Sequence, residues 1–324
     1  MFPVARPTGA AAASMSISSP PEQSRAPVHH AELDVCSLCG GAADLAFTAV
    51  DRNREITAQP FRYRRCRICA AYSLVDVPQD LGRFYPADYY GVRDIAALEE
   101  RGWIEEHKVA RVRAHVQSGR LVEIGPGGGG FAHAARRAGY EVSVIEMDER
   151  ASRNLREVVG IDAITSDVPA EALAELPQVD VIVMWHVIEH LPNPWEVVAA
   201  CAERLRPGGA LVIAAPNPEA LQFRLLKSRW AHLDAPRHLV LLPLGTLAER
   251  CAAVGLRQAE MTTSDPAGRH LNWMGWEYGA RRRPAAGPPP RLLALTTLAF
   301  TLAMRPVEHS GLRGAAYTAV FVKV

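Results

Sequence analysis

One stretch of the sequence constrains the fold more than any other: LVEIGPGGGGF, from Leu121 to Phe131. The apolar run from Leu121 to Ile124 predicts a buried strand, and five of the next six residues are glycine. The segment from Phe131 to Ala138 then predicts a helix that ends at Gly139. A strand, a glycine-rich turn and a helix form the first unit of a nucleotide-binding α/β sheet. The start of that helix leaves backbone N–H groups free to face a ligand.

The turn alone leaves two kinds of ligand open. Gly125 to Gly130 fits the GxGxxG fingerprint of dinucleotide sites. Together with Glu123, the same residues fit the ExGxGxG turn that resembles S-adenosylmethionine (SAM) sites. Glu146, at the end of the next expected strand, would bind a ribose in either case. The turn therefore predicts an adenosine-containing ligand and leaves hydride and methyl chemistry open.

Strand and helix patterns alternate from Arg120 onward. The expected strands cover 121–124, 141–146, 163–165, 179–185 and 210–214, followed by a closing pair at 256–263 and 315–322. This order predicts a doubly wound, Rossmann-like α/β sheet. Two inserts, about 217–243 and 265–313, follow strand ends, where such sheets bind ligands, so we expect them to cover the substrate.

Charge and composition narrow the class of protein. A formal net charge of +1 gives no support for a general nucleic-acid binder, which would usually be strongly basic. Residues 1–32 are rich in Ala, Ser and Pro and are expected to be disordered. They show no secretory signal, so we expect a cytoplasmic protein.

The apolar segment 292–304 is too short to span a membrane. We expect a buried or interface helix there, with weak contact to a membrane surface as the alternative.

Four cysteines near the amino terminus form two CxxC pairs, Cys36 with Cys39 and Cys66 with Cys69. Two such pairs can place four thiolates tetrahedrally around one zinc ion, and a site with four protein ligands is structural rather than catalytic. The surrounding sequence does not resemble a thioredoxin βαβ unit, which disfavours a redox pair. With strands expected near 46–50 and 60–65, the sequence predicts a zinc ribbon.

The segment that follows the cysteines is expected to link them to the sheet. An aromatic turn from Phe84 to Gly91 either caps the cofactor pocket or packs the linker on the main domain. A single helix is then predicted from about Ile95 to Gln117, because apolar residues recur there at helical spacing.

Two later segments distinguish between the two chemistries. VIEHLPNP, from Val187 to Pro194, and LRPGGALVI, from Leu205 to Ile213, resemble class I SAM-dependent methyltransferases around their fourth and fifth strands. With the CxxC pairs, HLDAPRHL, from His232 to Leu239, is similar to the subgroup that carries an amino-terminal zinc ribbon and modifies sugars or secondary metabolites. The resemblance implies a seven-stranded sheet with an antiparallel last strand. The predicted division is a tail (1–32), a zinc ribbon (33–78), an aromatic turn with a linking helix (79–118) and a methyltransferase domain (119–324).

The resemblance also assigns eight residues to the SAM site: Glu123, Gly125, Gly127, Gly129, Glu146, Met147, Asp167 and Trp185. The first four would lie at the methionine and ribose end of SAM. Glu146 would accept hydrogen bonds from both ribose hydroxyls. Met147 would pack on the adenine, Asp167 would accept a hydrogen bond from the adenine amino group, and Trp185 would lie beside the sulfonium.

The expected reaction is displacement of the methyl group by a hydroxyl, or a carbon, of a sugar or secondary metabolite. A hydroxyl needs a base, and histidine suits that role near neutral pH. His186 ranks first because it follows the fourth strand, close to the expected methyl position. His238 ranks next, with Asp234 to orient it and Arg237 as an anion clamp, whereas His190 is expected to be structural.

Other functions stay open at this point. An RNA methyltransferase could carry a similar zinc module, and an NAD-dependent dehydrogenase would share the glycine turn. A protein that binds SAM without turnover is a further alternative. The sequence leaves the methyl acceptor and the oligomeric state undetermined.

Overall fold

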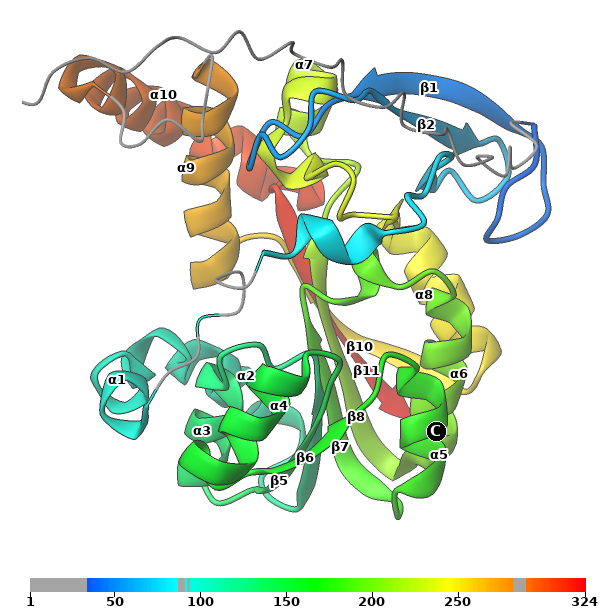
Figure 1. The fold of residues 1–324 in the computed structure, drawn as a ribbon, viewed down its shortest axis with the longest axis vertical. Helices are drawn as coiled ribbons and strands as arrows, with labels where there is room; N and C mark the ends of the chain where they lie inside the picture. The colour runs from blue at the N-terminus through cyan, green and yellow to red at the C-terminus, as the bar shows by residue number, and fades with distance from the viewer. Residues whose placement is uncertain (1–33, 87–90, 92–93, 282–289) are drawn as a thin grey trace, which may run out of the picture.

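The computed structural model describes residues 34–86, 91, 94–281 and 290–324. The predicted disordered tail and part of the aromatic turn lie outside these ranges. Figure 1 shows a large sheet with helices on both of its faces and a smaller sheet, containing β1 and β2, on one side of it.

The strands are β1 (Ala43–Ala49), β2 (Phe61–Cys66), β3 (Tyr72–Leu74), β4 (Arg120–Ile124), β5 (Glu141–Glu146), β6 (Asp162–Thr165), β7 (Val179–Trp185), β8 (Leu205–Pro216), β9 (Val240–Leu241), β10 (Leu256–Thr262) and β11 (Ala316–Lys323). The helices are α1 (Ile95–Glu100), α2 (Glu106–His115), α3 (Gly130–Arg137), α4 (Glu149–Asn154), α5 (Pro169–Glu175), α6 (Pro194–Arg204), α7 (Leu221–Leu226), α8 (Leu244–Ala253), α9 (Pro266–Ala280) and α10 (Arg291–His309).

The large sheet has seven strands in the order β10-β11-β8-β7-β4-β5-β6. The neighbouring pairs from β8 to β6 are parallel, whereas β11 runs antiparallel to both β8 and β10. The predicted seven-stranded sheet with an antiparallel last strand is therefore confirmed. The reversed strand lies inside the sheet, between the fifth and sixth strands of this sheet in chain order.

The sheet is buried on both faces, because alternate residues of its central strands enter different apolar clusters. Val181 and Val183 of β7 pack with α2 and α3, whereas Ile182 and Met184 pack on the opposite face with α6 and α8. Side chains alternate between faces along a strand, so a near-continuous apolar run is the expected pattern for a strand covered twice. The apolar packing on both faces of the sheet therefore fixes the positions of the strand ends.

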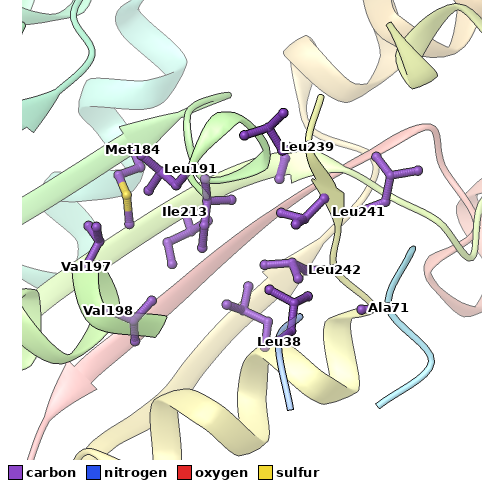
Figure 2. Packing of buried hydrophobic residues seen from close by; sticks show 14 of the residues in the cluster. Leu38, Ala71, Met184, Leu191, Val197, Val198, Ile213, Leu239, Leu241 and Leu242 are labelled. Atoms are coloured by element: carbon purple, nitrogen blue, oxygen red, sulfur yellow. The ribbon is translucent and has the colours of Figure 1, made fainter. Parts of the chain in front are cut away.

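The smaller sheet has the order β1-β2-β3-β9. Its last strand comes from the first insert, so the sheet crosses the predicted boundary between the zinc ribbon and the larger domain. Figure 2 shows the shared apolar cluster: Leu38 and Ala71 lie beside Leu241 and Leu242, and the cluster continues to Met184 of β7 in the large sheet. The amino-terminal unit is thus packed on the main domain through a common core.

The prediction of one long helix at 95–117 is wrong. For the apolar segment 292–304, the helix is present and only the buried alternative is contradicted. The expected single helix at 95–117 is broken into α1 and α2, with a 3₁₀ turn at Gly102–Ile104 between them, since glycine weakens a helix interior. The apolar segment 292–304 lies in α10, but its apolar side is not buried: Leu292 is 75% exposed. The side that packs on the protein carries Thr297, Thr301 and Glu308. Among the described residues, none of the helices is long and apolar enough to cross a membrane.

A buried charge network joins the smaller sheet to the first insert. The guanidinium of Arg237 is fully buried, and its Nη2 lies 2.8 Å from Asp51 Oδ1 and 2.6 Å from Asp234 Oδ1. Asn53 donates a 2.5 Å hydrogen bond to the same Asp234 oxygen. Tyr63 of β2 donates to the carbonyl of His238 at 2.8 Å. These contacts fix where the insert lies relative to the amino-terminal unit.

Replacing Asp51 with Ala should lower the free energy of unfolding by about 3–5 kcal/mol, because it leaves the buried Arg237 charge incompletely paired. Urea unfolding followed by circular dichroism measures this change. The matched control is Asp44→Ala, which removes the exposed pair between Asp44 and Arg67. Exposed pairs contribute little, so the control should unfold like the wild type. Equal unfolding of both variants would show that the buried network does not hold the two parts together.

Candidate functional site

The ends of the parallel strands converge at one edge of the large sheet. A pocket of about 350 Å³ lies there, which we call the edge pocket. Gly125 lines it after β4, Glu146 and Met147 after β5, Asp167 after β6, and His186 after β7. Four segments that are distant in the sequence thus meet, because parallel strands end on the same side. Five of the residues predicted for the SAM site and catalysis share this pocket.

The glycine turn comes close to the chain that follows β7. Gly125 has a φ of +67°, and a Cβ at this position would lie 2.7 Å from Val187 Cγ2. A side chain is therefore excluded both by the backbone conformation and by the lack of space. Gly127 and Gly129 also have positive φ angles, although neither of them lines the edge pocket.

Glu146, the residue expected to bind the ribose, is hydrogen-bonded to the glycine turn. Its side chain is almost fully buried and accepts hydrogen bonds from the backbone N–H groups of Gly127 (3.2 Å) and Asp148 (2.9 Å). Burial raises the pKa of this carboxyl, and the two backbone donors oppose that shift. Glu146 therefore ties the glycine turn to the end of β5, in the position expected for a ribose ligand.

Glu123 is buried in β4 and does not line the edge pocket. Its Oε2 has no hydrogen-bond partner among the described residues, and burial raises its pKa to about 8. Lys108 counteracts the shift, whereas Glu105, which lies against Gly130, adds to it. The sequence analysis did not consider Glu105 and Lys108, because they come from α2 and the turn before it, outside the strand-end motifs.

A second, larger pocket of about 940 Å³ lies beside the first and is called the wide pocket. Its lining includes α2, the ends of β7 and β8, the start of α9, and β11. Trp185 lines this pocket rather than the edge pocket, and Lys108 Nζ lies 5.1 Å from the centre of its ring. His186 lines both pockets. His186 thus lies where the two pockets meet.

His186 is held in an uncommon backbone conformation, with a φ of +58°. Positive φ angles are uncommon for residues other than glycine and are concentrated at functional sites. The side chain is 35% exposed, and its Nδ1 lies 3.4 Å from Glu189 Oε1. Burial favours the neutral form of Glu189, but the neighbouring histidines, His186 first, hold its pKa below the ordinary value. The buried carboxylate is therefore positioned to orient His186.

The other two histidines lie differently from the prediction. His190 lines the edge pocket, where its Nδ1 is 3.0 Å from the hydroxyl of Tyr85. His238 lines neither pocket and stacks edge-on behind His190, with 4.7 Å between ring centres. Arg237 is fully engaged with Asp51 and Asp234 and is not available as an anion clamp. His238 Nδ1 bonds the carbonyl of His232, not Asp234.

The four amino-terminal cysteines lie together in the smaller unit. Sγ atoms are 3.8 Å apart between Cys36 and Cys69 and 3.5 Å apart between Cys39 and Cys66. Zinc–sulfur bonds of about 2.3 Å in a tetrahedron separate the sulfurs by about 3.8 Å, so the arrangement fits one zinc ion. Backbone N–H groups at 68 and 69 point at the sulfur of Cys66. The thiols come from two CxxC turns at one end of β1 and β2.

Comparison with known proteins identifies the family. Residues 98–260, half of the chain, match a family described as a methyltransferase domain. The chain belongs to the class I SAM-dependent methyltransferases. The strand order and the pocket at the strand ends agree with this assignment. The dehydrogenase alternative, which rested on the glycine turn and on Glu146 as a ribose acid, is therefore wrong.

Two curated relatives are "Ubiquinone biosynthesis O-methyltransferase" proteins. That of Stutzerimonas stutzeri (strain A1501) is 32% identical over 44% of this chain and 60% of its own length. That of Pseudomonas fluorescens (strain SBW25) is 30% identical over 59% of this chain and 82% of its own length. The chain thus spans about three fifths of the first relative. Among solved structures, a SAM-dependent methyltransferase from Archaeoglobus fulgidus is 18% identical with a TM-score of 0.46, over 71% of this chain and 100% of that chain.

Replacing Glu146 with Ala should weaken SAM binding by about tenfold or more, because hydrogen bonds to a charged group are worth about 1.5–3 kcal/mol each. Isothermal titration calorimetry measures the affinity. Glu141→Ala is the matched control, since Glu141 is an exposed residue at the other end of β5. If both variants bind SAM like the wild type, Glu146 does not bind the ribose.

Proposed function

We propose that this methyltransferase transfers the methyl group of SAM to a hydroxyl of a small-molecule acceptor, with His186 as the base. One observation carries the proposal: His186 lines both the edge pocket and the wide pocket. The edge pocket contains Glu146, Met147 and Asp167, which suit the adenosine part of SAM. The wide pocket then holds the acceptor. A base between the edge pocket and the wide pocket lies where the methyl group would pass from SAM to the acceptor.

The chemistry follows from this placement. His186 takes the proton of the acceptor hydroxyl, the oxygen forms a bond to the methyl carbon, and the carbon–sulfur bond breaks with its electron pair remaining on sulfur. Glu189, 3.4 Å from His186 Nδ1, stabilises the imidazolium that forms. The protein otherwise aligns the reactants and excludes water, which suits a reaction that disperses the sulfonium charge.

The acceptor class follows from the relatives and from the lining of the wide pocket. The relatives' names specify O-methylation, which supports oxygen as the attacking atom. Trp103, Trp185 and Tyr317 line the wide pocket, together with the basic residues Arg101 and Lys108. Glu106 and Asp265 line the same pocket and balance these two positive charges, so the lining gives no preference for a charged acceptor. The aromatic walls suit a ring-bearing acceptor. A sugar-linked or secondary metabolite of this kind agrees with the sequence prediction, and the RNA alternative stays untested.

We further propose that the four-cysteine cluster binds a structural zinc ion. The sulfur distances and the four protein ligands support a closed site. Because β9 pairs with β3, the ion stabilises a sheet that includes part of the insert. The zinc thus supports the strand that directly follows His238.

Replacing Cys39 with Ala should remove zinc from the protein, because three thiolates no longer complete the tetrahedron. Inductively coupled plasma mass spectrometry measures the zinc content of the purified chain. Cys201→Ala is the matched control, since Cys201 is a buried cysteine of α6 outside the cluster. Wild-type zinc content in both variants would contradict the assignment.

Replacing His186 with Gln should lower kcat by about 10²–10⁴-fold and leave the SAM affinity nearly unchanged, because only the proton acceptor is lost. Formation of S-adenosylhomocysteine is measured with a panel of phenols, glycosides and nucleotide sugars. His115→Gln is the control: this histidine lies at the end of α2, lines neither pocket and pairs with Glu260. Near-normal turnover of His186→Gln would place the base elsewhere.

A further inference from the structure

Three side chains beside His186 form a cluster: Glu189, His190 and His238. The proposed methyl transfer assigns a role to Glu189 and none to the two histidines. One ligand atom of each lies within 4.8 Å of those of the other two. Glu189 and His190 belong to the 3₁₀ turn that follows β7, whereas His238 comes from the insert before β9. The cluster is therefore built by the tertiary fold from segments almost fifty residues apart.

Hydrogen bonds determine which imidazole nitrogens are free. His190 Nδ1 lies 2.9 Å from the carbonyl oxygen of Arg237, and His238 Nδ1 lies 2.9 Å from that of His232. A carbonyl oxygen can only accept, so each Nδ1 carries a proton and each Nε2 keeps its lone pair. Metal-binding histidines are commonly oriented by such carbonyl partners.

Glu189 supplies the observation that points to a ligand. The residue is 1% exposed, and neither carboxylate oxygen accepts a hydrogen bond from the part of the chain that the structure describes. Within the described ranges, its one ion-pair contact is with His186, whose Nδ1 lies 3.4 Å from Oε1. A buried carboxylate is unfavourable unless it is paired or bound to a metal. The single long contact leaves most of its acceptor capacity unused.

We propose that Glu189, His190 and His238 bind one divalent transition-metal ion, separate from the zinc of the cysteine cluster. Two imidazoles and one carboxylate suit manganese, iron(II), cobalt or zinc, whereas magnesium and calcium take mainly oxygen ligands. Three protein ligands leave coordination positions open, unlike the closed cysteine site. His190 lines the edge pocket beside Tyr85, so a small molecule in that pocket can reach the ion.

The position of the site gives the ion a role that rests on the proposed function. His186, which contacts Glu189, is the residue common to both pockets. An acceptor oxygen bound to the ion there has a lowered pKa, which favours transfer of its proton to His186. The ion would therefore select acceptors with an oxygen able to coordinate a metal next to the hydroxyl that is methylated.

The test titrates Mn²⁺ into the full chain with zinc already bound at the cysteine cluster, in the absence of SAM and acceptor. Electron paramagnetic resonance of free Mn²⁺ should show one additional bound ion per chain. Glu189→Gln and His238→Ala should each weaken this binding at least tenfold. His133→Ala, which removes a buried histidine of α3 outside the cluster, should bind Mn²⁺ like the wild type.

A second measurement needs no variant and covers the case in which a substitution impairs folding. In the wild-type protein, bound Mn²⁺ should broaden the ring signals of His190 and His238 in the NMR spectrum and leave those of His133 sharp. Absence of additional Mn²⁺ binding, or broadening that spares both His190 and His238, would overturn the metal site. Neither result depends on methyl transfer, so the metal site and the proposed reaction can fail separately.

Discussion

A fully buried guanidinium is the interaction on which the arrangement of this protein depends. Arg237 reaches from the first insert to Asp51 in the amino-terminal unit and to Asp234 in its own turn. Its charge is satisfied only when both segments are in place, because a buried charge without partners is strongly unfavourable. The backbone carbonyl of Arg237 then accepts a hydrogen bond from His190, and that of His238 accepts one from the Tyr63 hydroxyl. The amino-terminal unit therefore helps to build the site, in addition to any zinc that it binds.

The large sheet supplies the second constraint. Its parallel strands deliver Gly125, Glu146, Asp167 and His186 to one edge, although about twenty residues separate consecutive strand ends along the chain. The antiparallel β11 and helix α9 complete the wide pocket on the other side of His186. The same residue thus faces two spaces with different linings, one suited to a nucleoside and the other to an aromatic acceptor.

Burial of the acidic residues of the site is energetically unfavourable, and a bound ligand can offset this penalty. Burial raises the pKa values of Glu123 and Glu146, whereas the neighbouring histidines lower that of Glu189. Glu123 and Glu189 have oxygens without hydrogen-bond partners among the described residues. Buried acceptors of this kind favour the binding of donors or cations, because binding replaces the hydration that was lost on folding. In the proposals above, Glu146 binds the ribose of SAM and Glu189 binds a metal ion.

The sequence by itself determined the sheet, since a buried strand is read from its own apolar run: β5 and β7 match their predicted bounds, and β4 and β6 differ by one residue. It also indicated the SAM family and the four-cysteine cluster, because those motifs are local in the chain. It failed where a contact partner is distant. The break at Gly102, the exposed apolar side of α10 and the addition of β9 to the smaller sheet depend on packing that no local pattern contains. Only the tertiary structure decided that His238 lies behind His190 rather than at the pocket, because the fold alone brings together side chains from the turn after β7 and from the insert.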